Sequence, residues 1–509
     1  MRELLLTATT RGRGEFLRGS ILMKHAVSFL VLSLCVSAIS SYAQQPIPEP
    51  GPPRSVVIPS VKETKLKNGL TVAVIEKKGV PLVTVQLLVK NGANTEGASK
   101  AGLANLTASL LTKGTKTRSA TQIAEEIEFL GGSIFSFAGW QNSSVGLSIT
   151  SDKFDKAMEI MADVALHPSF TEDELKLAKS QTLDELTYNL TQPGFLANYV
   201  STRFSFNEHP SSGSPASIEA LTRTDVAKFY TENYRPAESV LIFVGDISNE
   251  KASAAAQKFF GAWTGAMRGG LSNARGTIGA AAAEKSVIDR FLVIDLPKSG
   301  QASVNYVKSI RGVGRNSGGF FPASVLNSLL GGGYSSRLNQ EIRIKRGLSY
   351  GAGSNFAWRM GKSNFGARTQ TKNESAAEVA ELIVDEIKRL AESAAADAEL
   401  VPRKSVLNGG FGRELETTQG LAGALASIYT YGLPTSVLNT YMSSVNAVKA
   451  AEIKSFAASN LFGGDLIIVG DYDVFKADLE KRFPNRSISV IKASELDIDS
   501  ETLRKGDVP

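Results

Sequence analysis

The sequence predicts an α+β fold made of two homologous domains, each a mostly antiparallel sheet with helices packed on one face. The first observation is an internal repeat: Val244-Gly245-Asp246 recurs 225 residues later as Val469-Gly470-Asp471, and Glu174-Leu175 recurs at the same offset as Glu399-Leu400. The second is the order of elements, which is strands, helices, strands, helices, strand, helix in both copies. Matches that keep register over such a distance indicate a duplicated domain.

The third observation is a Gly- and Ala-rich stretch between the copies, which is typical of an interdomain linker. The predicted organisation is a first domain at 60–263, a linker at 264–285, a second domain at 286–485 and a polar tail at 486–509.

In the first domain, Asn68-Gly69 lies between apolar residues and predicts a hairpin turn. The β-branched runs 71–75 and 82–89 predict paired strands, and residues 133–150 predict two more. A central strand is expected at 240–245. Apolar spacing and capping signals predict helices at 101–112, 120–130, 151–166, 171–190, 222–232 and 249–260.

The composition is that of an ordinary globular protein, with 509 residues, 42% of them apolar and 21% charged. The net charge is +6, and half of this excess comes from residues 1–43. Since no basic run occurs in the remainder, nucleic-acid binding is not expected.

The first 43 residues predict export. Met23-Lys24-His25 gives a charged start, an apolar run follows, and Ser41-Tyr42-Ala43 fits a cleavage site before Gln44. We interpret Met23 as the true start, with residues 1–22 as an upstream mis-start, and residues 44–59 as a Pro-rich arm. Lipidation at Cys35 stays open, although Leu34 is larger than the residue that usually precedes a lipidated Cys. A secreted or periplasmic, soluble protein without a stable membrane span after cleavage is expected.

Residues 101–115 hold the most informative motif of the first domain. Leucines at helical spacing predict a short amphipathic helix that ends at Gly114. Asn105, Ala108 and Ser109 lie at i, i+3 and i+4, so they share one face of this helix.

This frame, Gly-Leu-Ala followed by Leu-Leu-x-Lys-Gly-Thr, resembles the zinc helix of the insulinase/pitrilysin metallopeptidases. That family carries His-x-x-Glu-His there, with two His as ligands and Glu as general base. Asn105, Ala108 and Ser109 occupy these positions here, and Glu185 matches the family's third ligand. Neutral oxygens are poor zinc ligands and Ala cannot accept a proton, so we expect this chain to bind no zinc.

Two alternatives bear on that expectation. Glu185 is interpreted here as a solvated helix residue, because one carboxylate does not hold zinc alone. A zinc site rebuilt from other residues lacks ligands, since the chain has three His, namely His25, His167 and His209, and one Cys. Both His167 and His209 precede a proline in a loop, and each is expected to have a structural role or to lie on the surface.

The second half holds Leu330-Gly331-Gly332-Gly333-Tyr334, then Arg343, then Gly347-Leu348-Ser349-Tyr350. A Gly-rich loop alone suggests phosphate binding, but no Lys-Ser/Thr follows it at P-loop spacing. The whole string resembles the second-domain signature of the insulinase family. The resemblance implies that the Tyr350 hydroxyl donates to the oxyanion of an attacked peptide carbonyl and that Arg343 holds substrate carbonyls.

The resemblance extends over about residues 60–485 and implies the LuxS/MPP-like metallohydrolase fold of the processing peptidases. It also implies a function: the non-zinc-binding subunit of a two-chain zinc peptidase, with zinc in a sibling subunit and peptides as substrates. The alternative is a non-catalytic scaffold or peptide-binding protein of the same fold. Phe135 departs from the small polar residues of the family's substrate-pairing edge strand. The sequence leaves homodimer and heterodimer open.

Overall fold

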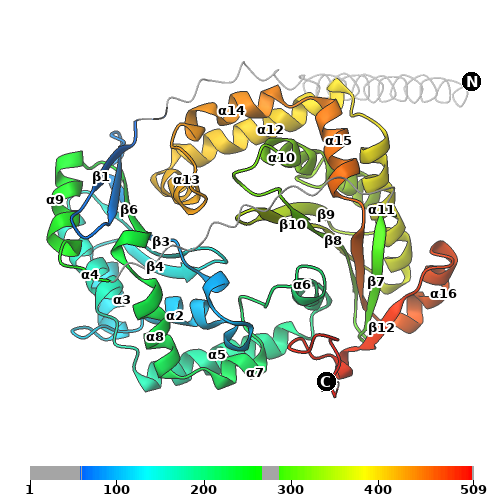
Figure 1. Cartoon of the computed structure of the whole chain (residues 1–509), viewed down its shortest axis with the longest axis horizontal. Coiled ribbons are helices and arrows are strands. Elements are labelled where there is room, and N and C mark those ends of the chain that lie inside the picture. Colours follow the sequence, from blue (N-terminus) through cyan, green and yellow to red (C-terminus); the bar gives the residue numbers. More distant parts are fainter. Residues whose placement is uncertain (1–57, 59, 266–285, 507–509) are drawn as a thin grey trace, which may run out of the picture. The chain divides into compact units, whose positions relative to one another are not determined.

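The computed structural model describes residue 58 and residues 60–265 and 286–506 (Figure 1). The predicted signal peptide (1–43), nearly all of the Pro-rich arm (44–59) and nearly all of the linker (264–285) lie outside the described residues.

The first half contains a six-stranded sheet in the order β1-β2-β6-β3-β5-β4, in which β2 and β6 are parallel and the other neighbours antiparallel. Its strands are β1 (Lys62–Lys65), β2 (Thr71–Glu76), β3 (Leu82–Val89), β4 (Ser133–Ala138), β5 (Ser143–Thr150) and β6 (Ser239–Gly245). Its helices are α2 (Leu103–Leu111), α3 (Ala120–Phe129), α4 (Phe154–Leu166), α5 (Glu172–Asn189), α6 (Pro193–Phe204), α7 (Pro215–Ala220), α8 (Arg223–Asn233) and α9 (Asn249–Phe260).

The second half contains a six-stranded sheet in the order β12-β7-β11-β8-β10-β9. Its strands are β7 (Ile288–Asp295), β8 (Ala302–Arg311), β9 (Ala352–Trp358), β10 (Lys362–Thr371), β11 (Gly464–Gly470) and β12 (Ser489–Lys492). Its helices are α10 (Phe320–Leu330), α11 (Ala376–Glu392), α12 (Asp397–Glu416), α13 (Thr418–Thr430), α14 (Val437–Ala447), α15 (Ala450–Asn460) and α16 (Tyr472–Arg482).

The two sheets confirm the predicted duplication and the α+β class. The order β2-β6-β3-β5-β4 of the first sheet has the same topology as β7-β11-β8-β10-β9 of the second, and β6 and β11 begin at Ser239 and Gly464, 225 residues apart. The Asn68-Gly69 hairpin is also confirmed, because β1 and β2 pair antiparallel and Gly69 has φ +92°.

The predicted pairing of strands 71–75 and 82–89 is wrong, because β6 lies between β2 and β3. The short connection from β2 to β3 crosses the end of β6, where Lys77 N donates to Gly245 O at 2.8 Å and Asp246 N donates to Leu82 O at 2.9 Å. Gly245 has φ +134°, and a Cβ there would lie 2.1 Å from the Leu82 carbonyl oxygen. The Gly of the repeated Val-Gly-Asp motif is therefore needed for this crossing.

The predicted polar tail also differs from the structure. Within residues 486–506, β12 pairs parallel with β7, and Ile491, Ile498 and Leu503 are buried. A strand of four residues gives little hydrophobic pattern of its own, and its register comes from backbone pairing with β7.

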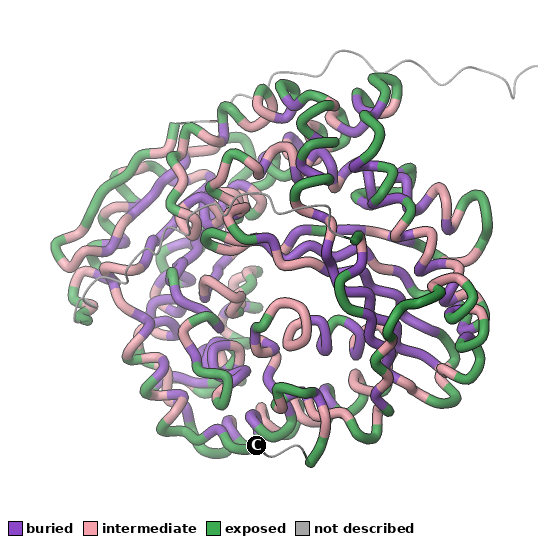
Figure 2. Tube along the Cα trace, turned by 45° about the vertical axis from the view of Figure 1, so that its right-hand side comes forward, coloured by how far each residue is buried: buried purple, intermediate pink, exposed green. Residues whose placement is uncertain are grey.

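Each sheet has helices of its own half on one face and a helix of the other half packed on the opposite face. In the first half α2 and α4 contact β5, and in the second half α10 contacts β9 and α11 contacts β10. The opposite face of β3 and β6 contacts α13, and the opposite face of β8 and β11 contacts α6. The central strands β6 and β11 are consequently buried along their whole length, within the largely buried sheets of Figure 2.

Candidate functional site

The predicted helix at 101–112 is α2, and its start is fixed by a buried carboxylate. Gly102 precedes it with φ +90°, and Glu96 accepts hydrogen bonds from Gly102 N at 2.9 Å and Ala104 N at 2.6 Å. His209 Nε2 lies 3.0 Å from the same carboxylate. His209 thus braces the helix start, which is the structural role expected for it.

The four positions of the degenerate zinc motif lie on neighbouring helices, since α2 and α5 pack against each other. The Asn105 amide donates to Ser211 O at 2.5 Å, and the Ser109 hydroxyl donates to Leu106 O at 2.9 Å. Ala108 is completely buried. Glu185 is exposed, and its carboxylate accepts from the Asn189 amide at 3.5 Å.

These residues do not fit a zinc ion. The polar groups of Asn105 and Ser109 are used within the protein, and Ala108 has none. Elsewhere in the part of the chain that the structure describes, no three His, Cys, Asp or Glu side chains are arranged to hold a metal.

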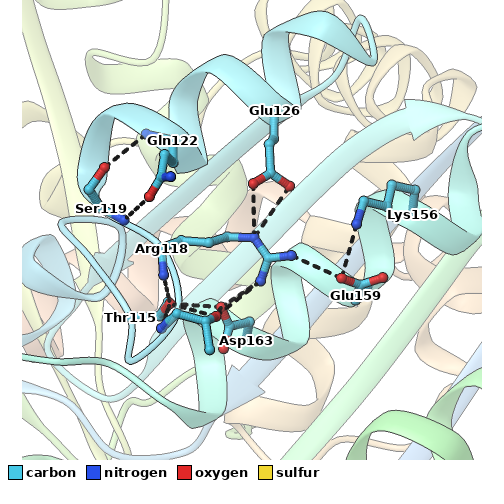
Figure 3. Close-up of polar contacts among 9 residues, drawn as sticks. Thr115, Arg118, Ser119, Gln122, Glu126, Lys156, Glu159 and Asp163 are labelled. Carbon is cyan, nitrogen blue, oxygen red and sulfur yellow. Dashed lines mark hydrogen bonds and ion pairs between the residues drawn. The ribbon is translucent and has the colours of Figure 1, made fainter.

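The end of the same frame has a structural role (Figure 3). The Thr115 hydroxyl donates to Asp163 Oδ2 at 2.7 Å, and Arg118 Nη1 donates to the same oxygen at 2.7 Å. Arg118 also pairs with Glu126 at 3.2 Å and Glu159 at 2.9 Å. Burial acts to raise the pKa of Asp163, but the hydrogen bonds from Thr115 and Arg118 outweigh it and lower that pKa. The frame therefore fastens the loop after α2 to α4.

In the second half, Arg343 lies in a π-helical turn, Asn339–Ile344. Its guanidinium carbon is 5.0 Å from the centroid of the Tyr334 ring, and no ion pair of Arg343 is found among the described residues. Tyr350 lies six residues after this turn, with 90% of its surface exposed. Among the described residues, Arg343 thus lies beside an aromatic ring and pairs with no carboxylate, and the Tyr350 ring is not packed in the core.

Tyr350 lines a cavity of about 490 Å³. Its other walls come from the start of α6, from β8 and from β10, including Asn198, Asn305 and Arg368. None of the degenerate motif positions lines it. Sequence reasoning missed α6 and Arg368, because nothing in their local pattern shows that a helix of the first half lies against the second sheet.

Two family models match this chain. The model described as insulinase (peptidase family M16) matches residues 71–207, and the model described as peptidase M16 inactive domain matches residues 220–407. The chain belongs to the insulinase family. The inactive-domain match includes both Arg343 and Tyr350.

Several curated proteins similar to this chain are named as zinc proteases. An uncharacterized zinc protease of Mycobacterium tuberculosis is 26% identical over 80% of this chain and 92% of that protein. One from Rickettsia bellii is 28% identical over 65% of this chain and 78% of that protein.

Solved structures agree with the fold. A peptidase M16 inactive domain from Pseudomonas fluorescens has a TM-score of 0.70 at 25% identity, over 81% of this chain and 98% of that chain. A protease from Helicobacter pylori has a TM-score of 0.72 at 20% identity, over 81% of this chain and all of that chain, which supports the fold alone. Within residues 60–265 and 286–506, no helix combines the length and apolar character that crossing a bilayer requires.

Proposed function

We propose that this protein is the non-zinc-binding subunit of a two-chain insulinase-type zinc peptidase. It would contribute Tyr350 and Arg343 to a zinc site carried by a sibling chain, and the two chains would cleave peptides together. An exported location, secreted or periplasmic, is part of the proposal and rests on the signal-like segment that ends at Ala43.

The observation that carries the proposal is the contrast between the two halves. On α2, Ala108 replaces the general base and is buried, so this chain has no group there to activate water. In the second half, Tyr350 is exposed on a cavity wall, and its hydroxyl makes no hydrogen bond with any described residue. A tyrosine hydroxyl is a neutral donor at pH 7, and one donor at an oxyanion contributes about 3 kcal/mol to lowering the barrier.

The test is a peptidase assay with this chain, the zinc-binding sibling and their mixture. The pure chain should be inactive and free of zinc, and the mixture active. Tyr350→Phe should lower kcat of the mixture about 100-fold without weakening assembly, because only the hydroxyl is removed. Tyr188→Phe, at another exposed tyrosine, is the matched control and should leave kcat unchanged. Full activity of the Tyr350→Phe mixture would exclude a shared active site.

The second candidate is a non-catalytic scaffold or peptide-binding protein of the same fold. The replaced zinc motif favours it equally, whereas a scaffold has no use for an exposed Tyr350 beside a polar cavity. Under this alternative the mixture assembles, and neither tyrosine substitution changes any activity.

A further inference from the structure

The cavity at Tyr350 carries one kind of charge. Arg368, on β10, is the one charged side chain in its wall, and no Asp or Glu of the described residues lines it. The rest of the wall is neutral and polar, with the amides of Asn198, Asn305 and Gln370.

Arg368 has neutral partners. Its Nη1 donates to Asn198 Oδ1 at 2.9 Å, and its Nη2 donates to Asn355 Oδ1. No ion pair of Arg368 is found within the described residues. Burial lowers the pKa of the guanidinium, yet arginine stays protonated in proteins. Its positive charge is therefore partly removed from water without a carboxylate to balance it, which is an arrangement that an anion would stabilise.

The start of α6 adds to the positive electrostatic potential in the cavity. The N-cap residue Gln192 makes no side-chain cap, so the amides of Gly194 and Phe195 on the cavity wall have no capping oxygen from it. Gln370 packs directly over Gly194, where a Cβ would lie 2.1 Å from its Nε2. The helix start, the guanidinium and the amide side chains thus line one space, in which Asn305 Nδ2 donates to Asn198 Oδ1 at 3.2 Å.

We propose that this cavity binds the carboxylate of a peptide, held by Arg368. A guanidinium fork matches a carboxylate with two parallel hydrogen bonds. A single cation balances a single negative charge, so a monoanionic carboxylate fits better than a phosphate dianion. That the carboxylate belongs to a peptide rests on the proposed function. Since Tyr350 and Arg368 line the same cavity, a peptide anchored by Arg368 would lie beside Tyr350.

The experiment measures binding of fluorescein-labelled Ala/Ser/Gly decapeptides to the full chain, without a sibling subunit, by fluorescence anisotropy. One peptide ends in a free carboxylate and its twin in an amide; a second amidated pair differs by one internal Glu or Gln. We expect at least one acidic peptide to bind about tenfold or more tightly than its neutral twin. The pair that shows the difference identifies a terminal or a side-chain carboxylate.

Arg368→Gln should remove this difference, and Arg368→Lys should retain part of it. Gln370→Glu should also remove it by placing a carboxylate in the cavity. Arg311→Gln, at the other end of the β8–β10 pair, is the control that keeps it. Equal binding of both twins in both pairs, or an unchanged preference in Arg368→Gln and Gln370→Glu, would overturn the proposal.

This test is separate from that of the proposed function. Tyr350→Phe should keep the carboxylate preference, because the phenol is not the group that recognises the charge. A normal preference together with an unaffected peptidase mixture would reject the shared active site and keep the cavity. A loss of kcat in the Tyr350→Phe mixture, together with equal binding of the acidic and neutral peptides, would keep the shared active site and reject the carboxylate site.

Discussion

The ion pairs of Glu208 join the two halves of the protein, and Glu208→Gln tests them. Glu208 follows α6, and its side chain is 4% exposed. Oε2 lies 3.2 Å from Arg359 Nη2, and Oε1 lies 2.8 Å from Lys362 Nζ. Both cations belong to the β9–β10 hairpin of the second half. The substitution keeps the shape of the side chain and removes its charge.

The size of the effect follows from these distances. At about 3 Å and an effective dielectric constant of about 20, each attraction is about 5 kcal/mol before the cost of desolvation. Breaking a buried pair usually costs about 3–5 kcal/mol. Since the side chains of Arg359 and Lys362 are 18% and 30% exposed, water can partly rehydrate them. We therefore expect the free energy of unfolding to fall by about 3 kcal/mol.

The assay is urea unfolding of the wild type, Glu208→Gln, Lys362→Met and the double variant. The two single substitutions should be coupled by at least about 1 kcal/mol. Glu125→Gln, at an exposed position on α3, is the control and should change stability by less than about 0.5 kcal/mol. A Glu208→Gln protein as stable as the wild type, or additive single effects, would refute the reasoning.

The same variant gives a pH prediction. Burial acts to raise the pKa of Glu208, but the attraction of Arg359 and Lys362 outweighs it, so the pKa is lowered in the folded state. The ionised carboxylate therefore stabilises the fold fully above the unfolded pKa of about 4.3, and this contribution is lost as the pH falls through the lower folded value. The stability difference between wild type and Glu208→Gln should shrink over that acidic range.

Three further substitutions test other parts of the structure. Arg118→Met should lower the free energy of unfolding by about 2 kcal/mol at pH 7, and this loss, measured by urea unfolding, should diminish as the pH falls through the lowered pKa of Asp163. Gly146→Ala should cost about 1–3 kcal/mol, because the new Cβ would lie 2.1 Å from the Phe135 ring; a second change, Phe135→Ser, should recover part of that loss, and no recovery would place the strain elsewhere. Leu425→Ala, on α13 and fully buried against the first sheet, should cost about 3 kcal/mol in thermal or urea unfolding, and a loss below about 1 kcal/mol would mean that α13 does not hold that sheet.

Much of the fold could be predicted from the sequence because its signals are local. The capping signals and apolar spacing placed α3 and α9 within a residue of their ends, and Gly69 marked the first hairpin. The predictions that failed concern pairing between strands far apart in the sequence. The neighbour of β2 is β6, more than 160 residues away, and the sequence of neither strand indicates which strand it pairs with. The strand β12 was missed for the same reason.

The candidate site divides in the same way. The residues around Asn105, Ala108 and Ser109 still match the zinc motif, so these three replacements could be recognised from the sequence. Their role, and that of Arg343, stays a prediction that peptidase assays must test. Arg368 could not be singled out, because one arginine in a strand has no pattern. Its significance comes from the absence of an acidic partner in the cavity wall, which is a property of the assembled structure.

The reciprocal placement of α6 and α13 has a consequence for the engineering of this chain. A single half would leave the apolar sheet surface beneath its missing helix bare to water. Fragments divided between residues 265 and 286 should accordingly be insoluble apart and should reconstitute one another when they are refolded together.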